Sequence, residues 1–377
     1  MGKTPSDSEA LERVDMVGKA MTVTGPIDAA QLGATVMHEH IFIDFTNGLT
    51  MGPPYNTPAT EVAFWDEKLT LENVHLVRER GLRNKDSAII SDIRIAVKEV
   101  FDFKSWGGNT IVDVTNIGIG RDPLALRRVA VETGVNLVMG SGWYAKRFHP
   151  PDMDQRTVED LTGEIVRDIT VGVGETGVRS GIIGEIGIDG GPLTSNELKS
   201  LKASAWASLS TGAAISLHYG GTDRERLQVA AILGEEGVNM DRVIFGHSDG
   251  YADDIPFLIE QLEMGAYIQF DLLGRVGAPI SRIPPVRGPG PTKPQGATTI
   301  LVGEAVPKLI DAGFGDRILL SQDVYTKIDL KTYGGTGYSF ILEKFVPFLR
   351  NRGVSEKHIR MLLIDNPRRV LAFAAPK

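Results

Sequence analysis

The chain has 377 residues, 42 % of them hydrophobic, and a formal net charge of −8, which allows one large folded domain. The negative charge argues against a nucleic-acid partner, because proteins that bind nucleic acids need a basic face. The sequence contains no run of about 20 apolar residues, the length that would predict a membrane span. Because cysteine is absent, disulfides are excluded and any metal ion must be held by His, Asp, Glu or Lys. These features suit a cytoplasmic enzyme with a small-molecule substrate.

The N-terminal part of the chain leads to a pair of histidines. Residues 1–20 are predicted to form a polar lead-in, and 21–377 a single domain that begins with a β run over Thr22–Ile27, stopped by Gly25-Pro26. The next predicted strand carries His38 and His40, which share a face because side chains alternate along a strand. Two imidazoles on one face can bind a metal ion together. Two hydrogen-bonded core histidines are the alternative.

After a predicted insertion over 51–107, which ends in an amphipathic helix at Ile90–Phe103, strands and helices alternate. Apolar strands are predicted at 108–116, 135–142, 181–187, 213–218, 242–247, 266–271 and 317–323. The predicted helices cover 123–130, 156–176, 194–210, 222–236, 253–263 and 298–312. Two more follow within 339–373, and Asn366-Pro367 is expected to break or restart the second.

With the histidine strand, this alternation gives eight strands, which predicts an α/β fold of the (β/α)8 or TIM-barrel type. An open doubly wound sheet is the competing architecture, but no glycine-rich phosphate turn follows the first strand. A Pro/Gly-rich loop over 273–297, densest at 282–296, interrupts the pattern after the seventh strand. In a barrel this loop would lie over the active site. An interdomain linker is less consistent with the alternation, which resumes in phase after it.

Polar residues of the metal-ligand type stand at the ends of five predicted strands. They are His38, His40, Glu185, His218, His247 and Asp323. In a barrel these ends meet at one face, where active sites form. Each residue alone has an ordinary structural explanation, such as a hydrogen-bonded core histidine or a turn-capping aspartate. Together they predict a cation site, because carboxylates buried among neutral imidazoles are costly without positive charge.

Six ligands suggest two divalent metal ions. His38, His40 and Asp323 would hold the more buried ion. His218 and His247 would hold the more exposed one. Glu185 would bridge both through its two oxygens. Such a pair suits hydrolysis by a metal-bridging hydroxide, with Asp323 as the catalytic proton shuttle to the leaving group. Zinc is the expected metal, and Mn, Fe or Co would also fit these ligands.

Several motifs resemble the phosphotriesterase family of the amidohydrolase superfamily over about 21–375. They are Gly25-Pro26-Ile27, Leu32-Gly33, His38-Glu39-His40, Val112-Asp113-Val114, Gly120-Arg121-Asp122, residues 181–187, Gly246-His247, residues 333–338 and Asn366-Pro367. Within that family the chain is most similar to the phosphotriesterase-related proteins. Phosphotriesterases and related lactonases place a carboxylated lysine at the bridging position, which here is Glu185. The resemblance therefore implies cleavage of a carboxylic amide or ester, such as an N-acyl compound.

Four residues are predicted to contact the substrate. The resemblance places Tyr144 in the lining of the pocket, and Asn116 ends the second strand. Arg275 follows the seventh strand and Tyr325 follows Asp323. Arg275 can pair bidentately with an anionic substrate group. Pairing of Arg275 with a loop carboxylate is the equal alternative.

Four functions remain open from the sequence. The first is a binuclear metal-dependent hydrolase for amides or esters, expected to be a homodimer. The second is a phosphotriesterase or lactonase. The third is a lyase or isomerase with one metal and Asp323 as a base. The fourth is a non-catalytic binding protein that retains the site.

Overall fold

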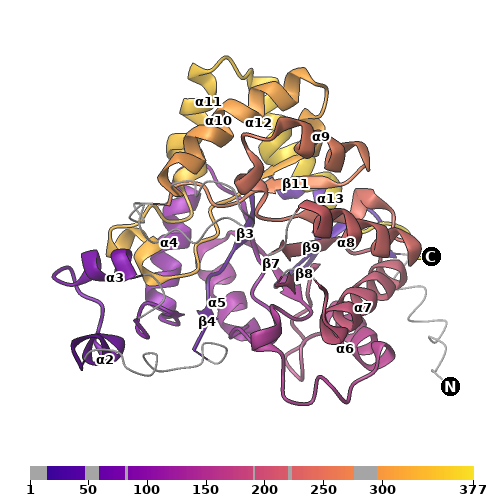
Figure 1. Ribbon diagram of the computed structural model, residues 1–377, viewed down its shortest axis with the longest axis horizontal. Coiled ribbons are helices and arrows are strands. Elements are labelled where there is room, and N and C mark those ends of the chain that lie inside the picture. The colour runs from indigo at the N-terminus through magenta and orange to yellow at the C-terminus, as the bar shows by residue number, and fades with distance from the viewer. Residues whose placement is uncertain (1–14, 47–58, 81–83, 190–191, 220–222, 276–294) are drawn as a thin grey trace.

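Eight parallel strands form the centre of the computed structural model, in the order β3-β6-β7-β8-β9-β10-β11-β12, and Figure 1 shows helices around them. The structure describes residues 15–46, 59–80, 84–189, 192–219, 223–275 and 295–377. The strands are β3 (Thr35–Glu39), β6 (Thr110–Asp113), β7 (Asn136–Ser141), β8 (Ile182–Ile188), β9 (Ile215–Tyr219), β10 (Val243–Phe245), β11 (Tyr267–Phe270) and β12 (Ile318–Leu320). The predicted barrel is thereby confirmed.

The two outermost strands of this order are joined just beyond their ends. The Asp323 N–H donates to the His38 carbonyl at 3.1 Å, and the His40 N–H donates to the Val324 carbonyl at 3.1 Å. The barrel therefore closes through the segments that carry three of the predicted metal ligands.

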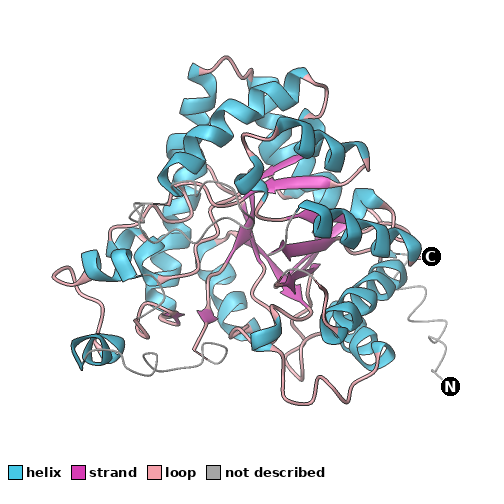
Figure 2. Ribbon diagram, in the orientation of Figure 1, coloured by secondary structure: helices cyan, strands magenta, loops and turns pink. Residues whose placement is uncertain are grey.

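A helix lies between each barrel strand and the next from β3 to β12, the last of several elements in the case of β3, and Figure 2 shows these helices outside the strands. They are α4 (Ile93–Ser105), α5 (Pro123–Thr133), α6 (Val158–Thr170), α7 (Ser195–Thr211), α8 (Asp223–Glu235), α9 (Ile255–Glu263) and α10 (Gln295–Asp311). Local chemistry sets their ends. In α7, Thr194 and Glu197 form a capping box, and Gly212 ends the helix in the left-handed conformation.

The barrel interior is apolar below the polar strand ends. Successive strands contribute buried side chains to one cluster, which includes Met37, Val112, Val138, Ile182, Ile244 and Leu319. Side chains from strands on opposite sides of a barrel can meet only in its interior, so this cluster fills the interior of the barrel. Residues from β1 (Lys19–Thr22) and from the C-terminal helix α13 (Asn366–Leu371) belong to the same cluster and cover the opposite end from the histidines.

The N-terminal β run differs from its prediction. It forms a hairpin of β1 with β2 (Gly25–Asp28), so Gly25-Pro26 starts a second strand instead of stopping the first. Pro26 lies opposite Met21 in a two-stranded sheet, where an edge position needs no N–H donor from the proline. The predicted lead-in thus ends earlier, because Lys19 is already in β1. Residues 1–14 lie outside the described part.

The predicted insertion contains α2 (Ala59–Asp66), α3 (Val74–Arg80) and β5 (Ile89–Ile90), and it ends in α4. β5 pairs antiparallel with β4 (Ile43–Asp44), so α4 starts at Ile93 and not at residue 90. Asp92 caps that start by accepting from the Arg94 and Ile95 amides. Residues 51–58 and 81–83 of the insertion, and 276–294 of the predicted Pro/Gly loop, lie outside the described residues.

Of the two outcomes predicted at Asn366-Pro367, a break or a restart, the structure shows the restart, because α13 begins at Asn366 with Pro367 in its first turn. The chain remains helical from Glu356 to Leu371 through α12 (Glu356–Arg360), a π-helical turn at Met361–Asp365 and α13. The wider π turn before Pro367 accommodates a residue that lacks an N–H and would crowd a regular preceding turn. Pro347 in α11 (Val346–Asn351) follows a π turn at Ile341–Phe345 in the same way.

Another predicted helix, over 156–176, is shorter than expected. α6 begins after the cap residue Thr157 and ends at Thr170, and Gly172 follows shortly after with a φ of 130°.

None of the helices in the described part of the chain combines the length and the apolar character that a membrane span requires.

Candidate metal centre

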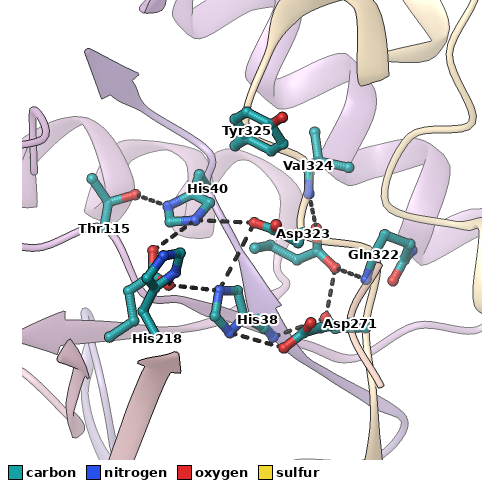
Figure 3. Close-up of polar contacts among 12 residues, drawn as sticks. His38, His40, Thr115, His218, Asp271, Gln322, Asp323, Val324 and Tyr325 are labelled. Carbon is teal, nitrogen blue, oxygen red and sulfur yellow. Dashed lines mark hydrogen bonds and ion pairs between the residues drawn. The ribbon is translucent and has the colours of Figure 1, made fainter. Parts of the chain in front are cut away.

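The ends of the strands bring all six predicted ligand residues together, and Figure 3 labels His38, His40, His218 and Asp323 among them. β3 carries His38 and is followed by His40, β8 carries Glu185 and β9 carries His218. His247 and Asp323 follow β10 and β12 and both have positive φ, near 50°. These are the only described non-glycine residues with positive φ, so the backbone bends at two of the six positions to aim a side chain inward.

One group consists of His38, His40 and Asp323, whose ligand atoms all lie within 4.8 Å of one another. His40 Nε2 is 3.3 Å from Asp323 Oδ1, and His38 Nε2 is 3.8 Å from the same oxygen. His38 and His40 are at most 1 % exposed. This is the more buried group, as predicted.

A second group consists of Glu185, His218 and His247. His218 Nδ1 lies 2.8 Å from Glu185 Oε2 and 2.7 Å from His247 Nε2. The side chains of His218 and His247 are 20 % and 13 % exposed. They are therefore the ligand candidates that solvent or a substrate reaches first.

Glu185 lies between the two groups. Its Oε1 is 3.3 Å from His40 Nε2, while its Oε2 is 3.1 Å from His38 Nε2 and 2.8 Å from His218 Nδ1. The sheet register shifts at both relevant strands, between Val36 and Glu39 and between Ile183 and Ile186. Such irregularities re-aim side chains at the rim of a barrel.

Asp271, just after β11, is part of the centre and was missed by the sequence analysis. It lies 2.7 Å from His247 Nδ1 and 3.3 Å from His38 Nδ1, and it also accepts the His247 N–H. Gln269 holds it through a 2.8 Å bond from Nε2. Asp271 ends the predicted strand 266–271, so the strand-end rule that found the six ligands would also have found it.

The electrostatics of the centre call for positive charge. Burial alone lowers the pKa of His38, but the carboxylates of Glu185 and Asp271 raise that pKa to about 9. Burial likewise lowers the pKa of His40, which Asp323 and Glu185 raise to about 10. Burial raises the pKa of Glu185, yet His218 and His38 hold it well below its usual range. Ionised carboxylates at this depth thus require protons on the histidines or a bound cation.

A divalent cation fits these residues better than protons do. His38 Nε2 is fully buried and has no hydrogen-bond partner among the described residues, although Glu185 is close. The Nδ1 atoms of His38, His40 and His247 are occupied by Gln269, Thr115 and Asp271. Partners on one nitrogen orient the ring and leave the other nitrogen for a metal.

Glu39 has no ligand role, because its side chain points away from the two histidines that flank it. It accepts hydrogen bonds from Ser321 Oγ (2.6 Å), the Gln322 amide (2.8 Å) and the Val324 amide (2.8 Å). Ser321 Oγ in turn accepts the His38 N–H. This buried carboxylate therefore fixes the segment in which Asp323 stands.

The predicted substrate-contact residues occupy different places. Tyr144 lies beside the centre, with its hydroxyl 3.1 Å from His218 Nε2. Arg275 is bonded through Nη2 to Asp323 Oδ2 at 2.5 Å and stacks over Tyr325. Asn116 donates to the backbone carbonyl of Glu185, which gives it a structural contact. Contact of these four residues with a substrate stays a prediction.

An aromatic wall borders one side of the centre. The ring of Phe45 lies 5.9 Å from that of Tyr144 and 5.6 Å from that of Tyr325. Phe148 packs against both Phe45 and Tyr144. The sequence analysis did not single out the two phenylalanines, because they carry no polar group and match no motif.

The description of the Phosphotriesterase family matches residues 18–371. The chain belongs to the phosphotriesterase family. The resemblance seen in the sequence is thereby confirmed, together with the expectation that the protein is a hydrolase of that family.

Similar proteins span nearly the whole chain. The N-acetyltaurine hydrolase of Dictyostelium discoideum is 37 % identical over 375 residues, covering 95 % of this chain and 99 % of its own length. A resiniferatoxin-binding protein from Rhodobacter sphaeroides has the same fold, with a TM-score of 0.84 and 33 % identity, covering 94 % of this chain and 95 % of its own. A lactonase from Listeria monocytogenes gives a TM-score of 0.72 at 25 % identity, covering 94 % and 99 %.

The role of Glu39 predicts a stability effect. Glu39→Gln replaces one acceptor oxygen by an NH2 group that faces a donor, so one buried N–H or O–H loses its partner. We expect the free energy of unfolding to fall by about 1–3 kcal/mol, measured by urea denaturation. The control Glu356→Gln removes an exposed pairing with Arg350 and should leave the urea midpoint nearly unchanged. An unchanged midpoint for Glu39→Gln would contradict this role.

Proposed function

We propose that the chain is a binuclear metal-dependent hydrolase that cleaves a carboxylic amide bond. The observation that carries the proposal is the position of Glu185, whose Oε1 faces His40 and whose Oε2 faces His218. One carboxylate between two groups of histidines is the arrangement that a pair of divalent ions requires. The buried negative charge of the centre and the unpartnered His38 Nε2 support the same assignment.

In this proposal His38, His40 and Asp323 would hold one ion, His218 and His247 would hold the other, and the Glu185 carboxylate would serve both. Two ions held there would lower the pKa of a water molecule and polarise the scissile carbonyl. Zinc is the expected metal, since imidazole and carboxylate ligands suit it, although Mn, Fe and Co are also accepted by such sites.

Asp323 is proposed to move the proton during hydrolysis. Its Oδ1 points toward His40, while its Oδ2 is held by Arg275. The carboxylate can take a proton from the attacking water and deliver it to the departing amine nitrogen. Arg275 fixes the orientation of Asp323 and helps to keep it ionised, because burial raises the pKa of Asp323 while Arg275 and His40 lower it below its usual value.

The proposed substrate is an N-acyl amine whose amine part carries an anionic group. The relatives named N-acetyltaurine hydrolase support this class, since taurine is an amine with a sulfonate. The Nε atom of Arg275 is buried and has no hydrogen-bond partner among the described residues, so it can donate to such an anion. The aromatic wall favours a small acyl group near the ions.

Lactone hydrolysis is the second candidate, because the chain shares its fold with a lactonase at 25 % identity.

A substrate panel separates amide hydrolysis from lactone hydrolysis. The zinc-loaded protein would be tested on N-acetyltaurine, an uncharged N-acetyl amine, an aryl ester, a lactone and an aryl phosphotriester. We expect the highest kcat/KM for N-acetyltaurine. A higher value for the lactone would favour the second candidate, and turnover of none of them would contradict a hydrolase of this kind.

Replacing the bridging carboxylate should weaken metal binding and activity together. In Glu185→Gln the amide cannot give a charged oxygen to each ion, so metal affinity should fall by at least roughly 100-fold. Metal content after dialysis against a chelator measures this. Glu197→Gln is the matched control, since Glu197 is equally buried and, in the described part of the chain, its carboxylate accepts from the Asp189 and Thr194 amides and the Thr194 hydroxyl. Full activity of Glu185→Gln with wild-type metal content would contradict the bridging assignment.

Asp323→Asn tests the proton shuttle. The amide retains an oxygen ligand but cannot accept a proton, so kcat should fall by about 10²- to 10⁴-fold. Thermal unfolding and metal content, measured on the same sample, show whether the fold and the ions are retained. A kcat within tenfold of the wild-type value, roughly 1.4 kcal/mol in the barrier, would be inconsistent with this role.

A further inference from the structure

Arg226, on α8, is a buried arginine that reaches the end of β10. The residue is 1 % exposed. Its Nη2 donates to the carbonyls of Gly246 (2.5 Å) and His247 (3.2 Å), and its Nη1 donates to Ser248 Oγ at 3.0 Å. Gln261 Oε1 accepts a further bond at 3.2 Å. Three of these four acceptors belong to the segment 246–248, which carries one of the proposed metal ligands.

This segment has an unusual backbone. His247 adopts a φ of 50° and a ψ of 38°, in the left-handed region that non-glycine residues seldom occupy. Such a conformation persists only where its surroundings fix it. Asp271 holds the N–H and the Nδ1 of His247, and Arg226 holds the carbonyls of Gly246 and His247 on either side. Arg226 and Asp271 thus fix His247 from two sides.

The contacts require an arginine. A guanidinium presents donors in a rigid plane and can bind several acceptors at once, whereas a lysine ammonium on a flexible stem cannot match that geometry. The Arg226 guanidinium also packs over the rings of Tyr251 (4.9 Å) and Phe245 (5.9 Å). Its plane is therefore set by the rings as well as by the hydrogen bonds.

The hydrogen bonds of Arg226 described above also involve the segment of only one of the two groups of candidate metal ligands, the group that contains His247. α8 is the helix that follows β9, the strand of His218, so Arg226 links the element after one histidine to the segment of the other. The four hydrogen bonds of Arg226 described above go to the segment 246–248 and to Gln261, and none of these four reaches His38, His40 or Asp323. A change at Arg226 should therefore reach only the His218 and His247 half of the centre.

We propose that Arg226 is a positioning residue that sets the metal affinity of the half formed by His218 and His247. This inference rests on the proposed binuclear function and adds a residue that none of the sequence motifs contains. Arg226 does not touch the metal or the substrate in this proposal. It acts through the peptide units on both sides of His247.

The test is a Zn²⁺ titration of the full chain in competition with chelators of graded affinity, resolved into two binding steps. The variants are Arg226→Lys, Arg226→Met and Ser248→Ala. In the arginine variants we expect one of the two steps to keep its wild-type affinity and the other to lose about 10- to 100-fold. Ser248→Ala removes one acceptor and should lose less, at the same step. Excess Zn²⁺ should restore kcat in all three variants.

The matched control is Arg317→Met. Arg317 also donates to a carbonyl, that of Gly265 at 2.8 Å, and lies over the ring of Tyr267, but at the opposite end of the barrel. This variant should lower thermal stability and leave both zinc affinities unchanged.

Unchanged zinc affinities in folded Arg226→Lys and Ser248→Ala would overturn the inference, and so would an equal loss at both steps. If Arg226→Met fails to fold, the other two variants decide. A wild-type protein that binds fewer than two zinc ions would instead refute the proposed function.

Discussion

The carboxylate of Glu185, shared between two groups of histidines, is the interaction on which the centre depends. Its oxygens reach ring nitrogens from β3 and β9, and the chain after β12 completes one of the groups. A carboxylate side chain is short, so these elements meet around it only if the sheet closes into a barrel. The closing contacts between the ends of β3 and β12 run through the ligand segments themselves. Closure of the fold and assembly of the centre are therefore one event.

A layer of supporting residues surrounds the ligands. Asp271 contacts a histidine of each group, Glu39 fixes the segment of Asp323, and Arg275 takes the outer oxygen of Asp323. Each support uses a group that the proposed ligand would not offer to a metal ion, such as an Nδ1, a backbone amide or a second carboxylate oxygen. Ring and carboxylate orientations are thereby set by the protein, which is the condition for tight metal binding.

The structure also shows where local sequence rules give way to packing. Pro26 lies within a strand because its edge position needs no donor, and Pro367 remains within a helical segment because a π turn precedes it. Both prolines are normally read as breaks. Arg275 illustrates the same limit for side chains. The sequence left a substrate anion and a carboxylate as equal partners, and the structure pairs it with Asp323, itself a proposed ligand.

The sequence by itself determined the barrel, the family and the six strand-end residues, because alternating strands and helices and the residues that end the strands are local patterns. Capping boxes such as Thr194 with Glu197 were readable for the same reason. Only the tertiary structure decided which ligand faces which, that Asp271 joins both groups and that Arg226 reaches His247 from a neighbouring helix. These contacts join residues far apart in the chain, and their distances depend on barrel closure and on the left-handed backbone at His247 and Asp323.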